Sequence, residues 1–212
     1  MKMRLLSLFD GTGSLSRPFF ETCEVQTLDI DGRFGCTLCC DILKWDYSEE
    51  ETPDYIWAGV PCEQYSTAHT VGVRHLASAD ALVAKTWEII NYFLVKNPAL
   101  EWWVENPDSS LLWKRAVAAP FTHKLRLDFC AYGAGYRKRT KLATNSSFEP
   151  RALCNPKTCH ACEGGRHRLT AQRGPQRGRT GDSCTLDQLH AYPAEFSKAV
   201  FDYCHAQSWE IV

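Results

Sequence analysis

The sequence predicts an α/β fold in which a mostly parallel sheet carries helices on both faces. Short apolar runs alternate with helical stretches along the 212 residues, as expected for consecutive strand and helix units. Three apolar runs end directly in chemically useful groups: the glycine turn Gly11–Gly13, the thiol of Cys62 and the carboxylate of Glu105. The carboxyl ends of parallel strands meet at one edge of a sheet, where open α/β folds bind ligands, so we expect these groups to form one site.

The expected elements follow from local patterns. The longest helix is predicted over 78–96, because apolar side chains recur at helical spacing until Asn97-Pro98 ends the pattern. Two further helices are expected near 14–21 and 185–206, and a short one within 107–113. Strands are expected near 4–9, 25–29, 37–40, 54–58, 101–104, 125–131 and 139–144.

The stretch 146–184 is rich in Cys, Gly, Arg and Pro and lacks apolar periodicity, so irregular structure is expected there. The chain therefore divides into a main domain over 1–145, an insertion over 146–184 and a C-terminal segment over 185–212 that packs back on the main domain.

Composition excludes several classes of protein. No apolar stretch reaches the roughly 20 residues that span a bilayer, and Asp10 interrupts the first apolar run before a signal-peptide core can form. We therefore expect an intracellular protein with no membrane partner. The eleven cysteines are odd in number and unevenly clustered, which favours thiols and a metal site over a secreted disulfide framework.

The net charge of −1 hides an uneven distribution. Residues 1–112 carry 8 Lys and Arg against 17 Asp and Glu, whereas residues 113–181 carry 15 against 3. Local positive charge is what phosphate contacts need, so the basic segment indicates a nucleic-acid face. A solvated basic surface without a partner is the alternative.

The glycine turn by itself is a weak signal. Ser16 stands where a dinucleotide fingerprint has its third glycine, so a plain NAD site fits poorly. Asp29 and Asp41 close the next two strands, and aspartates at successive strand ends beside a glycine turn favour a cofactor that carries a nucleoside.

Cys62 differs from most cysteines of the chain, which lie in apolar runs. It follows Pro61 at the end of a strand and precedes the polar stretch EQYS, so we expect an exposed thiol that can ionise and act as a nucleophile. Glu105 also ends a strand, and the stiff Asn106-Pro107 turn should hold its carboxylate in place.

Taken together, these features resemble the C5-cytosine DNA methyltransferase family in a compact form. The resemblance covers roughly residues 4–145 and the final helix. It is carried by LFDGTGS (8–14), Asp29, CCDI (39–42), GVPCEQYS (59–66), VENP (104–107) and YRKRT (136–140).

The resemblance implies an S-adenosylmethionine-dependent methyltransferase fold and methylation of cytosine C5 in DNA. It implies that Cys62 is the covalent nucleophile, that Glu105 engages cytosine N3, and that Arg137 or Arg139 lies near cytosine O2. For Arg137 and Arg139, a basic edge strand that resists aggregation is the alternative. The implied cofactor contacts are Phe9, Asp10, Gly11, Thr12, Gly13, Asp29, Ile30, Asp41, Ile42 and Pro61.

The sequence also departs from that family. Glu63 stands where the family usually has Gln, the arginine motif lacks its leading Gln, and the large target-recognition domain is missing. The recognised nucleotide sequence and any protein partner for targeting therefore stay open.

The insertion predicts a zinc site in place of the missing domain. Cys154, Cys159, Cys162 and His167 supply four suitable ligands at tetrahedral zinc spacing. His160 could replace His167, and Cys184 could replace a cysteine; free thiols in a flexible loop are the alternative. The arginine-rich tract 166–181 is expected to act as a clamp on phosphate that the metal anchors.

Three other functions remain as alternatives to DNA methylation. The same chemistry on RNA uses the same residues. A non-catalytic nucleic-acid-binding zinc module is disfavoured by the joint presence of Asp10, Cys62 and Glu105. Methylation or hydroxymethylation of free pyrimidine nucleotides also uses a Pro-Cys thiol, but the glycine turn and the basic segment disfavour it.

Overall fold

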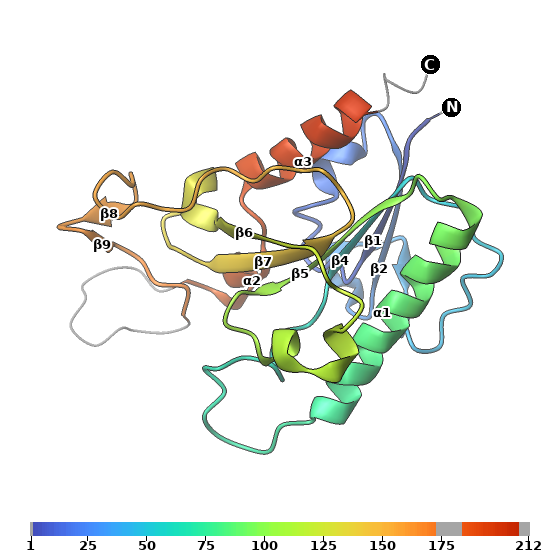
Figure 1. Cartoon of the computed structure of the whole chain (residues 1–212), viewed down its shortest axis with the longest axis horizontal. Helices are drawn as coiled ribbons and strands as arrows, with labels where there is room; N and C mark the ends of the chain where they lie inside the picture. Colours follow the sequence, from blue (N-terminus) through green and yellow to red (C-terminus); the bar gives the residue numbers. More distant parts are fainter. Residues whose placement is uncertain (1, 173–183, 208–212) are drawn as a thin grey trace.

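The computed structural model describes residues 2–172 and 184–207, and Figure 1 shows the arrangement of their elements. The helices are α1 (Leu76–Lys96), α2 (Leu186–His190) and α3 (Ala194–Gln207). The strands are β1 (Arg4–Leu8), β2 (Glu24–Asp29), β3 (Leu38–Cys39), β4 (Tyr55–Gly59), β5 (Glu101–Pro107), β6 (Lys124–Asp128), β7 (Arg139–Thr144), β8 (Cys162–Glu163) and β9 (Arg166–His167).

Seven strands form one sheet in the order β3-β2-β1-β4-β5-β7-β6. Strands β1 to β5 are mutually parallel, and β7 runs antiparallel to both of its neighbours. The chain leaves β1 toward β2 on one side and resumes beside β1 with β4 on the other. This reversal is a topological switch point, where the loops after neighbouring strands diverge and leave room for a ligand.

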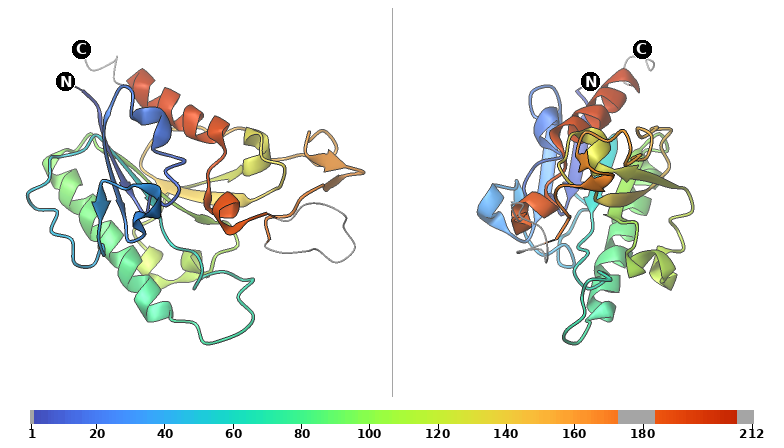
Figure 2. Two further views of the ribbon diagram at one scale, coloured as in Figure 1. Left: turned by 180° about the vertical axis from the view of Figure 1, so that it is seen from behind. Right: turned by 90° about the vertical axis from the view of Figure 1, so that its left-hand side faces the viewer.

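Each face of the sheet is covered by a different helix, as the two views in Figure 2 show. Leu6, Ile56 and Val104 point to the face on which α1 packs. The alternate residues Trp57 and Trp103 point to the face on which α3 packs. This period-two alternation buries both faces of the central strands β1, β4 and β5, which are therefore mostly apolar. The result is the mostly parallel α/β sheet with helices on both faces that the sequence predicts.

The expected strands are confirmed to within a few residues, but three elements differ from the prediction. The expected helix at 14–21 is only a 3-10 turn, Arg17–Phe19. The strand expected over 125–131 ends at Asp128, where a 3-10 helix, Phe129–Tyr132, begins. The expected C-terminal helix is broken into α2 and α3, because Pro193 lacks the N–H that a continuous helix would need.

The insertion contains a small hairpin, β8 and β9, which turns at Gly164 and Gly165. Both glycines have positive φ angles of 57° and 77°, which glycine adopts without a steric penalty. The chain division at 145 and 184 stays a prediction. Among the described residues, no helix combines the length and apolar character needed to cross a membrane.

Candidate active site and candidate metal centre

The strand ends that the sequence singles out surround one cavity of about 360 Å³. Cys62 and Glu105 reach this cavity from β4 and β5, and the glycine turn reaches it from β1. The cavity is also lined by residues that follow β2, by Lys138 just before β7 and by residues of α2. Of the residues predicted for catalysis or cofactor binding, it brings together Phe9, Asp10, Gly11, Thr12, Asp29, Ile30, Pro61, Cys62 and Glu105.

The turn after β1 is built from unusual backbone conformations. Gly11 and Gly13 have positive φ angles of 50° and 67°, and Phe9 has a positive φ of 57°. A non-glycine residue in this region stores strain of roughly 1–3 kcal/mol, and such strain gathers at functional sites. The half-buried Asp10 carboxylate secures the turn by accepting hydrogen bonds from Ser7 Oγ at 2.6 Å and Ser16 Oγ at 2.8 Å. Burial raises the pKa of Asp10, an effect that these two hydroxyls oppose.

Asp29 connects the turn to the end of β2. Its Oδ2 accepts a hydrogen bond from the Gly11 backbone N–H at 2.8 Å, and its Oδ1 accepts one from the Asp31 N–H at 2.8 Å. A carboxylate oxygen has two lone pairs, so each oxygen can still accept a hydroxyl donor. The sequence prediction that Asp29 holds ribose hydroxyls is compatible with these contacts.

Cys62 is half-buried at the cavity wall, which is less exposed than the sequence indicates. Burial, followed by the negative charge of Glu105, raises its pKa to about 11, while the positive charge of Lys138 acts in the opposite direction. The expectation of an easily ionised thiol therefore needs correction: in this environment Cys62 is a protonated thiol at neutral pH.

Glu105 is buried to 6% exposure. The phenol of Tyr192 donates a hydrogen bond to its Oε2 at 3.1 Å. The buried Oε1 has no hydrogen-bond partner among the described residues. A buried carboxylate oxygen without a donor is costly, so this oxygen is suited to receive a donor from a bound ligand.

Neither of the two expected arginines supplies a cation to the cavity, which is lined by Lys138 and Arg33 instead. Arg139 pairs with the buried Asp128 through two hydrogen bonds of 3.0 and 2.8 Å. Neither Arg137 nor Arg139 lines the cavity, whereas Lys138 between them does. Lys138 directly precedes β7, and its Nζ donates a hydrogen bond to the Leu189 carbonyl of α2 at 3.0 Å, beside the α2 residues that line the cavity.

Asp41 and Ile42 do not line this cavity either. Strand β3 is only two residues long, and beyond it Asp41 Oδ1 accepts a hydrogen bond from the Leu43 N–H at 3.0 Å. Ile42 packs in the apolar core beneath α1. Gly13 is also absent from the lining. The cofactor contacts of these three residues stay predictions.

Several cavity residues are not predicted by the sequence. The unexpected lining residues include two exposed apolar side chains, Phe34 at 40% exposure and Leu186 at 37%. They lie in the lining together with the expected Ile30, which is 74% exposed. Tyr192 and Lys138 are further additions. The local sequence signal for Tyr192 is the proline that follows it, because proline marks a break rather than the interior of a helix.

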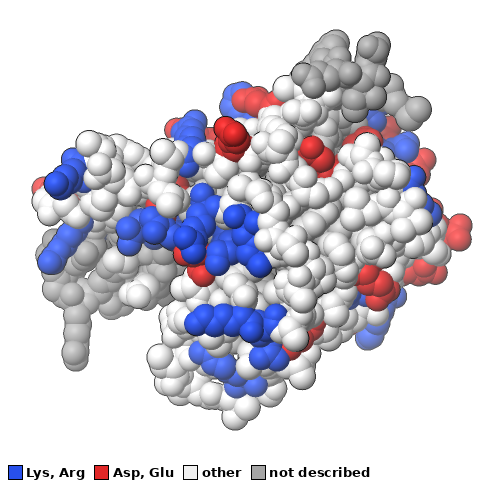
Figure 3. All heavy atoms as spheres, viewed as in Figure 1, with Lys and Arg blue, Asp and Glu red and all other residues white. Residues whose placement is uncertain are grey.

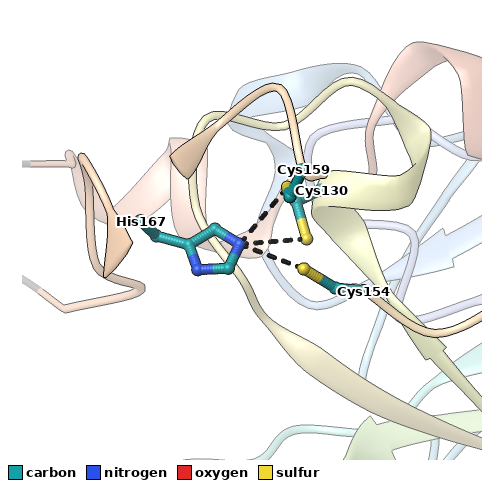
Figure 4. A group of neighbouring side chains, drawn as sticks. All are labelled: Cys130, Cys154, Cys159 and His167. Atoms are coloured by element: carbon teal, nitrogen blue, oxygen red, sulfur yellow. Dashed lines mark hydrogen bonds between the residues drawn. The ribbon is translucent and has the colours of Figure 1, made fainter. Parts of the chain in front are cut away.

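A second group of side chains lies beyond β6 (Figure 4). The ligand atoms of Cys130, Cys154, Cys159 and His167 all lie within 4.8 Å of one another. His167 Nε2 is 3.3 Å from Cys130 Sγ, 3.4 Å from Cys154 Sγ and 3.6 Å from Cys159 Sγ. Tetrahedral zinc with ordinary Zn–S and Zn–N bonds has an N···S edge of about 3.6 Å. The cluster therefore has the chemistry and spacing of a tetrahedral zinc site.

This cluster differs from the predicted ligand set in one member. Cys130 occupies the fourth position, although its place in an apolar run indicates a buried thiol of no special role. Cys162 Sγ lies 3.4 Å from the opposite ring nitrogen, His167 Nδ1. Cys184 is buried, with its thiol directed at the Thr170 carbonyl. Among the described residues, neither Cys184 nor His160 belongs to the cluster of metal-ligand atoms.

Residues 173–181 of the expected phosphate clamp lie outside the described residues.

No model of a known protein family and no curated protein matches this chain. Among solved structures, the chain is similar to a methyltransferase of Entamoeba histolytica, EhMeth, with 13% sequence identity and a TM-score of 0.44. The match covers 72% of this chain and 56% of the length of that protein.

Proposed function

We propose that this protein transfers a methyl group from S-adenosylmethionine to C5 of cytosine, with DNA as the substrate. The observation that carries the proposal is the shared cavity of Cys62 and Glu105, in which the carboxylate leaves one buried oxygen without a partner. A thiol and a carboxyl oxygen without a partner, on adjacent parallel strands, are the two groups that the proposed chemistry uses: the sulfur adds to cytosine C6, and the carboxyl oxygen shares a proton with N3.

The cavity also fits the proposed cofactor. Exposed apolar side chains at Ile30, Phe34 and Leu186 suit a flat, apolar base. The carboxylates of Asp10 and Asp29 suit a positively charged sulfonium and ribose hydroxyls, respectively. When bound, S-adenosylmethionine would supply an electrophilic methyl group.

The side chains of the chain divide the remaining work. Cytosine C5 is a poor nucleophile until the Cys62 sulfur adds to C6 and increases the electron density at C5. The Cys62 thiol loses its proton as the sulfur adds to C6, and cytosine N3 gains a proton that Glu105 Oε1 shares with it, which neutralises the negative charge that develops. Lys138 favours the thiolate form of Cys62. Loss of the C5 proton and elimination of the cysteine then regenerate the free thiol. A cytosine in a duplex must first be flipped out of the stack.

The nucleic-acid partner is proposed from charge. Lys124 and Arg126 of β6 and Lys141 of β7 belong to a basic area on one side of the sheet, and Figure 3 shows lysines and arginines gathered over these strands. Asp108 pairs with Arg126 at 3.1 Å and with Lys141 at 3.0 Å, so the area is only partly neutralised. The positive charge supports a phosphate backbone as ligand.

The proposed zinc centre supports the fold rather than the reaction. Cys130 directly follows β6, whereas Cys159 and His167 belong to the insertion. A metal on these ligands would bind the insertion to the edge of the sheet and stabilise a segment with little apolar surface of its own.

The test is incubation with labelled S-adenosylmethionine and separate DNA, RNA and free cytosine nucleotides, followed by identification of the modified base. We expect 5-methylcytosine in DNA. Cys62→Ala should abolish transfer and trapping by 5-fluorocytosine DNA, yet leave cofactor binding nearly intact.

Cys39→Ala is the matched control, because it removes an exposed thiol that does not line the cavity. This variant should stay active. Methyl transfer by Cys62→Ala at the wild-type rate would refute the assignment of the nucleophile. Modification of RNA or of nucleotides in place of DNA would reassign the substrate.

A further inference from the structure

The Glu105 carboxylate is part of a hydrogen-bond chain whose direction the donors dictate. Trp57 Nε1 lies 3.2 Å from Tyr192 Oη, and Tyr192 Oη lies 3.1 Å from Glu105 Oε2. An indole N–H is only a donor. The tyrosine oxygen therefore accepts from Trp57 and uses its single proton to donate to Glu105.

The fold fixes the tyrosine in this position from several sides. Its backbone N–H donates to Ser14 Oγ at 2.8 Å, beside the glycine turn. Its ring packs edge-on against Trp57, with ring centroids 5.4 Å apart, and lies 5.9 Å from the ring of Phe196. Burial, followed by the charge of Glu105, raises the pKa of Tyr192 well above its ordinary value, so the phenol keeps its proton.

Gly59 supplies the space for the phenol. A Cβ atom at Gly59 would lie 2.8 Å from Tyr192 Oη. Any side chain larger than hydrogen at the end of β4 would therefore force the hydroxyl away from Glu105. Strand β4 therefore leads to Cys62 and, at Gly59, also leaves room for the Tyr192 hydroxyl that donates to Glu105.

We propose that Tyr192 is a positioning residue that engages Glu105 Oε2 and thereby presents Oε1 to the cytosine. This role rests on the proposed function. Because Oε2 is occupied, the carboxylate cannot rotate to exchange its oxygens without losing the bond to Tyr192. The substrate therefore meets the one oxygen that lacks a partner among the described residues, in a fixed orientation.

Tyr192→Phe tests this role, because it removes one hydrogen bond to a charged group and retains the ring. We expect kcat to fall about 10- to 100-fold, the range for loss of such a bond. The KM for DNA and the affinity for S-adenosylmethionine should change less than about threefold. A merely structural role would instead weaken cofactor binding, because Tyr192 lines the cofactor cavity.

The chain offers a matched control at the other end of β5. Tyr203 Oη donates to Glu101 Oε1 at 2.9 Å, so Tyr203→Phe removes the same kind of bond far from the cavity. This variant should keep the wild-type kcat.

Gly59→Ala provides an independent variant in which the phenol is present but displaced. We expect a similar fall in kcat. In the Tyr192→Phe background the hydroxyl with which the new methyl group at position 59 would clash is gone. Adding Gly59→Ala there should therefore lower kcat little further, so the effects of the two substitutions on kcat should be non-additive.

A wild-type kcat in Tyr192→Phe, a loss of cofactor affinity alone, or fully additive effects of the two substitutions would each overturn the positioning role while leaving the proposed function in place. Absence of methyl transfer to cytosine by the wild-type protein would instead refute the proposed function and, with it, this role.

Discussion

At the scale of single residues, Cys62 combines the position of a nucleophile with a high pKa. Burial and the neighbouring Glu105 raise its pKa from 9.0 to about 11. At pH 8 its thiolate fraction is therefore about 100-fold lower than that of a cysteine in the unfolded chain. We expect such a thiol to be alkylated slowly at neutral pH, because the reactive thiolate is the minority form.

This shift predicts the pH dependence of alkylation. A raised pKa means that the thiolate is the minority form at every pH below about 11. The rate at which iodoacetamide modifies Cys62 should therefore rise about tenfold per pH unit through pH 10 without a plateau.

The groups that act on Cys62 provide the controls for this experiment. Glu105→Gln removes a negative charge that raises the pKa, so alkylation at a given pH should become faster, and Lys138→Met should make it slower. Glu63 contributes in the same direction as Glu105. Peptide-level mass spectrometry measures the rate at each cysteine, and a plateau below pH 9 would contradict the assigned environment.

At the scale of elements, the β6–β7 hairpin places positive charge beside the candidate active-site cavity. Its first strand forms an edge of the sheet, and its second strand continues from the cavity residue Lys138. Lys124 and Arg126 are exposed on β6, and Lys124 and Lys141 approach the ring of Trp113 at 6.0 and 5.3 Å. Lysines over an exposed edge also discourage strand-to-strand aggregation, so the charge has two physical roles.

The phosphate-binding role predicts a change in salt dependence. The double variant Lys124→Ala, Arg126→Ala should weaken binding of any DNA sequence by a similar factor. The slope of log K against log salt should become shallower by about 2, because each neutralised phosphate contributes roughly 0.9. Fluorescence anisotropy over a salt series measures this slope.

Lys198→Ala is the control, because this lysine lies on α3 at the opposite face of the sheet and pairs with Asp202 at 2.7 Å. It should leave the slope unchanged. Equal slopes for the wild type and the double variant would remove β6 from the proposed nucleic-acid surface.

At the scale of the whole molecule, the metal cluster joins parts of the chain that are distant in sequence. Its members come from the turn after β6, the loop after β7 and the hairpin of the insertion. Cys154 is also tied to the sheet by its backbone N–H, which donates to Asp128 Oδ2 at 2.9 Å. The same Asp128 pairs with Arg139, so the metal cluster and the basic strand share one buried carboxylate.

This arrangement predicts which cysteines are needed for metal. Elemental analysis should find about one zinc per chain. Cys130→Ser and Cys154→Ser should each lower the zinc content and the melting temperature, whereas Cys162→Ser should retain the metal, because its thiol lies at the other nitrogen of His167.

Cys184→Ala serves as a control for removal of a buried thiol outside the cluster. Retention of zinc by Cys130→Ser and its loss from Cys162→Ser would favour the ligand set with consecutive spacing within the insertion. A metal-free wild-type protein with unchanged stability would eliminate the proposed centre.

The sequence by itself determines the strands, the long helix and the three groups at or just beyond strand ends, namely the glycine turn, Cys62 and Glu105. These are local consequences of apolar periodicity and of proline and glycine. It also indicates a cysteine-rich metal site, because closely spaced ligands are visible along the chain. Cys62, Glu105 and Asp29 each follow an apolar run, and the rule that parallel strands end at a common edge is enough to place all three together.

Only the tertiary structure decides which distant side chains complete each site. Tyr192 reaches Glu105 across 87 residues, and Cys130 reaches His167 across 37. Such contacts depend on packing rather than on spacing, since the break before Pro193 and the 3-10 turn after β6 aim these side chains. The choice of Lys138 over Arg137 and Arg139 has the same cause. Lys138 lies just before β7 and is held by the Leu189 carbonyl, a contact that exists only because α2 packs beside this end of the sheet.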